Sequence, residues 1–226
     1  MQVNFCKPIV VFFCWWALCI SVGCGNRQGY EAATIAAQLV SAGDVEVDRL
    51  DEATGVVYDV QLLEARWNNS FSDDDVLSTC ALAFFNNLST QESPDYVRLQ
   101  IKRGKKTIQR TFSSSELMLA DQAIDRVIDF FEWHPRMGMD SLRPMIDPLF
   151  FPDSLIEKIG QSVLQQDTID NALKHTEVVG FESDTVGGIP VVNVKVNAVR
   201  KQTRMRYDAF VRVPQLLVLL VAPAEE

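Results

Sequence analysis

The pattern of apolar and polar positions changes sharply near residue 24. Residues 9–20 are twelve consecutive apolar side chains, and Lys7 is the only charge before them. As a helix this run is about 18 Å long, whereas the hydrocarbon core of a bilayer is ~30 Å thick. A positive start, a short apolar core and the small residues Ser21 and Gly23 are typical of a cleaved export signal. The pattern therefore predicts a signal peptide over residues 1–23.

The next part of the chain alternates between helical and strand periods. Residues 31–42 predict a helix that stops at Gly43, 44–55 are acidic and indecisive, and 56–65 predict a strand. A helix follows over 72–88, and then 96–102 and 107–112 alternate as a hairpin around a turn at 103–105. Residues 31–114 are therefore expected to form a small two-layer α/β module.

Three consecutive aspartates, Asp73, Asp74 and Asp75, follow Ser72 at the start of the second helix. Carboxylates are favourable at the positive end of a helix, and Ser72 or Asp73 can accept hydrogen bonds from its free N–H groups. A metal site is the alternative, but the segment lacks the alternating ligand spacing of a calcium loop. We interpret the segment as a helix cap.

The second half is expected to place helices before strands. Ser113 begins a helix that runs to about Trp133, with Asp121, Asp125 and Asp129 on its solvent-exposed face. Shorter helices are predicted over 139–146, 153–165 and 168–174. Strands follow over 176–185, 191–200, 204–213 and 216–221.

Helices followed by a four-stranded antiparallel meander resemble the NTF2-like α+β fold. The likeness covers residues 115–223 and is strongest at DQAIDRVIDFFEW, residues 121–133; a cystatin-like arrangement would look similar. The resemblance implies either an enzyme with an Asp–His pair in a cone-shaped pocket or a non-catalytic binding or dimerising module. The predicted class is α+β, with the small module followed by an NTF2-like domain over 115–226.

Cys24 at the end of the leader resembles the lipobox cysteine of bacterial lipoproteins. The resemblance implies that Cys24 becomes the first residue and carries acyl chains such as palmitate, with residues 24–30 as a tether at the membrane. Ser21 stands where that family usually has leucine. Ordinary signal peptidase is the alternative, and it would leave a free thiol on a secreted or periplasmic soluble protein.

The charge of the chain limits its possible partners, and its cysteine content limits its possible disulfides. Without the leader the chain has 20 basic and 30 acidic side chains, a net charge of −10, which argues against nucleic acid because phosphate binding needs clustered cations. Cys80 is the only cysteine after Cys24, so the body has no internal disulfide. Its helical position among apolar residues predicts a buried thiol.

Catalytic motifs are absent from the sequence, and no cofactor or metal site is predicted. The remaining candidate pair is His134 with Asp140 as acid and base, against the alternative that His134 caps a helix end. His175, with Asp170 five residues earlier, is weaker.

Two surface features suggest binding. Lys195, Arg204, Arg206 and Arg212 fall on one face of the predicted sheet, where they would bind an anionic ligand or an acidic partner, or simply face solvent. Trp67 and Phe71 are two aromatics in a polar loop, as in carbohydrate and partner sites. The sequence thus predicts an exported, membrane-tethered, non-catalytic binding or scaffolding protein. The alternatives are a pocket enzyme using His134 and a homodimerising structural module.

Overall fold

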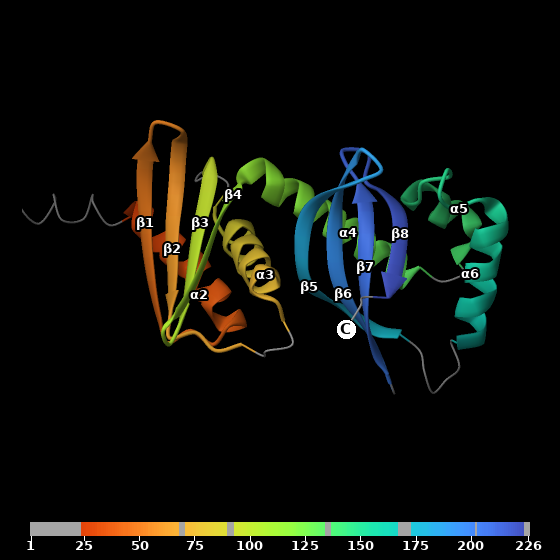
Figure 1. Cartoon of the computed structure of the whole chain (residues 1–226), viewed down its shortest axis with the longest axis horizontal. Coiled ribbons are helices and arrows are strands. Elements are labelled where there is room, and N and C mark those ends of the chain that lie inside the picture. The colour runs from red at the N-terminus through yellow and green to blue at the C-terminus, as the bar shows by residue number, and fades with distance from the viewer. Residues whose placement is uncertain are drawn as a thin grey trace, which may run out of the picture.

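The structure is a computed structural model that describes residues 24–67, 71–89, 93–133, 137–166, 173–201 and 203–223. Within them the chain forms two four-stranded sheets and flanking helices, and the predicted α+β class is confirmed (Figure 1). The elements are α2 (Cys24–Leu39), β1 (Asp44–Glu52), β2 (Gly55–Leu63), α3 (Asp73–Asn86), β3 (Tyr96–Arg103), β4 (Lys106–Ser113), α4 (Ser114–Glu132), α5 (Met139–Leu142), the 3₁₀ helix η2 (Arg143–Met145), α6 (Asp153–Gln166), β5 (Leu173–Val186), β6 (Ile189–Arg200), β7 (Arg204–Arg212) and β8 (Leu217–Pro223).

The first sheet has the strand order β1-β2-β3-β4. Two antiparallel hairpins, β1–β2 and β3–β4, are joined by a parallel β2–β3 pair. Helix α3 makes the crossover that a parallel connection needs, and α2 and α3 lie on the same face of this sheet (Figure 1). The indecisive acidic stretch is the edge strand β1, whose hairpin with β2 supplies the pairing that its own sequence does not reveal.

Helix α2 begins before the predicted start of the first helix. It starts at Cys24, so residues 24–30, which were predicted to be a tether, form its first seven residues. Gly29 is buried, and a Cβ there would lie 2.9 Å from the Tyr58 ring, so the missing side chain allows helix and sheet to approach closely. Ala32, Ala33 and Ala36, with no exposed surface, continue this contact. Packing of small residues therefore extends the helix seven residues before the predicted start at residue 31.

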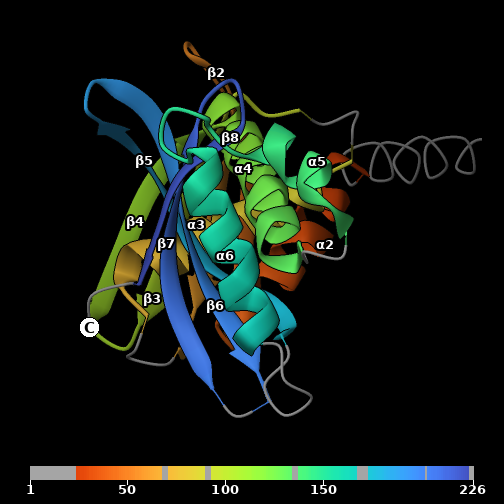
Figure 2. The same ribbon diagram turned by 90° about the vertical axis from the view of Figure 1, so that its right-hand side faces the viewer.

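The second sheet is an antiparallel meander, β5-β6-β7-β8, with the predicted strand order. Helices α4 and α6 lie on the same side of it (Figure 2), and Phe131 of α4 packs against Tyr207 of β7 with ring centroids 5.3 Å apart. The helix predicted over 168–174 is wrong at its end, because Leu173 and Lys174 already belong to β5. Residues 167–172 lie outside the described residues.

Helix α3 joins the two sheets by covering the edge strand β5 (Figure 1). The Phe181 N–H donates to Ser78 Oγ at 3.1 Å, and Thr79 Oγ1 donates to the Val179 carbonyl at 2.8 Å. A Cβ on Gly180 would come within 2.8 Å of the Asp75 Cα. These contacts satisfy backbone groups that an open edge strand would leave free, so the two modules share one interface.

None of the helices in the described ranges combines the length and the apolar character that crossing a membrane requires.

Candidate functional site

The four cations predicted to form a basic surface each have a carboxylate partner within the chain. The pairs are Lys195 Nζ–Asp75 Oδ1 at 2.9 Å, Arg206 Nη2–Asp75 Oδ2 at 2.6 Å, Arg212 Nη1–Asp147 Oδ2 at 2.8 Å, and Arg204 with Glu177. Lys195 also lies 3.8 Å from Glu182. The cations therefore stabilise contacts between elements through these ion pairs.

Asp75 is the centre of this charge cluster. Its side chain is 2% exposed, and it also accepts the Ser72 N–H while Ser72 Oγ accepts the Asp75 N–H, completing a capping box. Burial alone would raise the pKa of Asp75, but hydrogen bonds from Lys195 and Arg206 outweigh it and hold this pKa below its ordinary value. The predicted cap is confirmed, and one of its carboxylates also binds the second sheet.

Only one member of the proposed acid–base pair, Asp140, lies among the described residues. His134 lies outside the described residues, and Asp140 is exposed in the first turn of the four-residue helix α5. His175 is exposed on β5, with Nε2 3.1 Å from Glu177 Oε1. No cluster of three or more metal-ligating side chains occurs in the described ranges.

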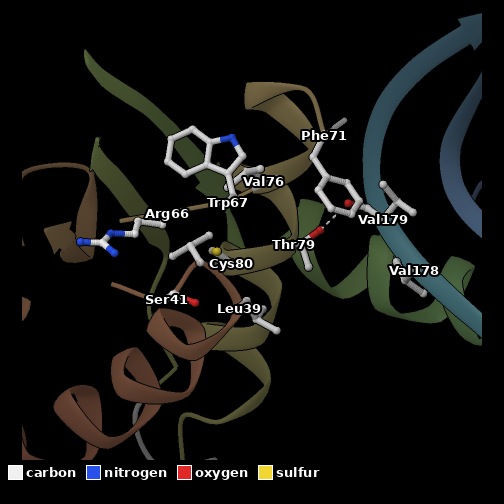
Figure 3. A pocket seen from close by; sticks show the side chains of 11 residues that line it. Leu39, Ser41, Arg66, Trp67, Phe71, Val76, Thr79, Cys80, Val178 and Val179 are labelled. Carbon is white, nitrogen blue, oxygen red and sulfur yellow. Dashed lines mark hydrogen bonds between the residues drawn. The ribbon is translucent and has the colours of Figure 1, made fainter. Parts of the chain in front are cut away.

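A groove of about 420 Å³ opens where α2, α3 and β5 meet (Figure 3). It lies beside the α3–β5 junction, so both modules contribute to it. Its lining is formed by Leu39, Val40, Ser41, Arg66, Trp67, Phe71, Val76, Thr79, Cys80, Val178 and Val179. The volume is within the range of small-molecule sites, and a mostly apolar lining with few polar groups is typical of them.

Some polar groups of the groove already have hydrogen-bond partners, whereas others can contact a ligand. The Thr79 hydroxyl donates to Val179, and the Cys80 thiol lies 3.7 Å from the Ala36 carbonyl. Burial raises the pKa of Cys80 to about 12, so this thiol stays protonated and unreactive. Arg66 and Ser41 are exposed at the end of the groove opposite Phe71 and have no side-chain partner among the described residues (Figure 3). Together with the indole N–H of Trp67, they are the polar side-chain groups of the described lining that remain to contact a ligand.

The aromatics that the sequence singled out, Trp67 and Phe71, both line this groove. Trp67 is further held by Arg103, whose guanidinium lies 4.8 Å from the centre of the indole ring. Leu39 and Val178 could not be recognised as lining residues from the sequence, because each is an ordinary apolar residue of a helix or strand. Only tertiary contact between the modules brings them together.

Ser41 has a φ of 46°, a conformation that favours glycine, just after the end of α2. We expect Ser41→Gly to raise the free energy of unfolding by about 0.5–1 kcal/mol, since relief of the left-handed backbone exceeds the added entropy of the unfolded chain. Urea unfolding measures this change. Ser41→Ala is the control, because it removes the hydroxyl and keeps the strain. Equal stability of the glycine and alanine variants would contradict the prediction.

The fold and the groove define an α+β protein with two sheets and a groove of small-molecule size where α2, α3 and β5 meet. The chain matches no family model, no curated protein and no solved structure.

Proposed function

We propose that this chain is an exported cell-envelope protein, anchored by lipid on Cys24, that binds a ligand without transforming it. The groove between the modules is the observation that supports ligand binding. It is apolar, large enough for a small molecule, and opens to solvent beside residues with free polar groups.

The chemistry of the lining supports binding over catalysis. Cys80 is held as a thiol, and the Thr79 hydroxyl already donates its proton to a carbonyl. Among the described residues neither lies beside a base that would activate it, whereas covalent catalysis needs a nucleophile and base within hydrogen-bond reach. Asp140 is exposed and is not among the residues that line the groove.

The position of α2 supports a short connection to the membrane. Because the helix begins at Cys24, an acylated Cys24 would attach the folded body directly, without an extended linker. Leu39, at the other end of α2, lies about 22 Å along the helix from Cys24, at 1.5 Å per residue. An acylated Cys24 would therefore lie at the opposite end of α2 from the groove.

Mass spectrometry of the protein from its native host tests both parts of the proposal. Under denaturing conditions we expect a chain that starts at Cys24 and carries added acyl mass. Under native conditions we expect an additional non-covalent mass that is lost on denaturation. A Cys24 without acyl mass would contradict the lipid anchor. A native spectrum that shows only the covalent mass would contradict the bound ligand.

A further inference from the structure

The groove differs in charge from the chain as a whole, which is acidic. The full chain has a net charge of −9, yet among the described residues that line the groove Arg66 is the only charged side chain. Other arginines near the module junction are paired, as Arg206 is with Asp75. Arg66 is exposed and has no carboxylate partner among the described residues. A free guanidinium beside an apolar groove attracts an anionic group.

The backbone around Arg66 is fixed while its side chain is free. The Arg66 N–H donates to the Val40 carbonyl at 2.6 Å, and the Ala65 N–H donates to the Lys102 carbonyl at 2.9 Å. These bonds tie the segment to the end of α2 and to β3. The Arg66 side chain therefore extends from a backbone that is fixed next to Val40 and Ser41, and a bound anion would not have to order this backbone. In Figure 3 the guanidinium points away from the other labelled side chains, so pairing with an anion in the groove requires the side chain to turn inward.

The rest of the groove suits an apolar body. Leu39, Phe71, Val76 and Val178 come from four different elements or loops and present only carbon to the space. Figure 3 shows Arg66 at one end and Phe71 with Val179 at the other. A ligand that is polar along its whole length would leave unpaired polar groups against this lining, which costs free energy.

Building on the proposed binding function, we infer that the ligand is an amphiphile with a single anionic head and an apolar tail. The head pairs with Arg66 and receives a hydrogen bond from Ser41. The tail lies between Leu39 and Phe71 and extends toward Val178. A carboxylate matches the planar donor fork of arginine, so a medium-chain carboxylic acid is the simplest member of this class.

Titration of the chain from residue 24 onward with dodecanoate and with dodecanol tests the inference, with calorimetry or tryptophan fluorescence as the readout. The two probes share a tail and differ in charge. We expect dodecanoate to bind on the order of tenfold more tightly than dodecanol, and Arg66→Gln to abolish this difference. Lys105→Gln removes the same charge from an exposed turn and is expected to leave both affinities unchanged.

The other outcomes separate the inference from the proposed function. Equal binding of both probes, insensitive to Arg66→Gln, overturns the anionic head but leaves a groove that binds apolar molecules. Failure of both probes to bind overturns the amphiphile class, and the native mass spectrum then decides independently whether the protein carries a different ligand. An equal effect of Lys105→Gln and Arg66→Gln would show that net charge, and not this site, selects the probe.

Discussion

Replacing Asp75 with asparagine is expected to lower the free energy of unfolding by about 3 kcal/mol. The substitution keeps the shape of the side chain and an oxygen that accepts the Ser72 N–H, but it leaves Lys195 and Arg206 without their shared anion. Removing one partner of a buried ion pair typically costs 3–5 kcal/mol. The low end applies because the Lys195 and Arg206 side chains are 19% and 32% exposed and regain some water.

Asp74→Asn is the matched control for Asp75→Asn. It removes the same charge from the same first turn of α3, but Asp74 is exposed. Its expected loss is only the helix-dipole contribution, about 0.3–1 kcal/mol. Denaturant unfolding of both variants makes the comparison. If they lose the same stability, the charge cluster does not hold the two modules together.

The same cluster predicts a pH dependence. Because the pKa of Asp75 is lower in the folded chain than in the unfolded one, ionised Asp75 stabilises the fold at pH values above its unfolded pKa of about 3.9. This contribution is lost as the pH falls through the lower, folded pKa. The stability difference between wild type and Asp75→Asn is therefore expected to be full at pH 7 and to shrink below about pH 4.

Local sequence signals predicted most of the elements but not how they assemble. The Ser72 cap and the antiparallel meander follow from short-range chemistry and alternation, and both are confirmed. The role of Asp75 could not be predicted, because its partner Lys195 lies 120 residues away. In the sequence Lys195 and Arg206 looked like residues on a solvated face. The structure shows that α3 reaches them from the other module.

The candidate site, too, could be predicted only in part from the sequence. Trp67 and Phe71 stood out as aromatics in a polar loop, and they do line the groove. Arg66, one residue earlier, carried no signal of its own, since a charged residue in a loop is ordinary. Its significance comes from what is absent around it among the described residues: a carboxylate partner. Sequence alone does not report such an absence.

Leu39→Glu is expected to weaken dodecanoate binding by at least about tenfold. Leu39 lines the groove but is 53% exposed, so the substitution is tolerated by the fold. The new carboxylate removes apolar contact and either repels the anionic head or pairs with Arg66; both effects lower affinity. Leu155→Glu, at a leucine 38% exposed on α6, is the control and should leave binding unchanged. Equal losses in both variants would contradict the assignment of the groove.

Hydrogen–deuterium exchange of the chain from residue 24 onward, with and without dodecanoate, tests most directly whether the site lies between the modules. Binding is predicted to slow exchange together at the end of α2, at Arg66 and Trp67, and at Val178 and Val179 of β5, and Leu39→Glu should abolish this slowing. One competing apolar surface is the turn before α6, where Leu149 is 79% and Phe150 43% exposed. Slower exchange confined to that turn, or to one module alone, would contradict a site shared by both modules.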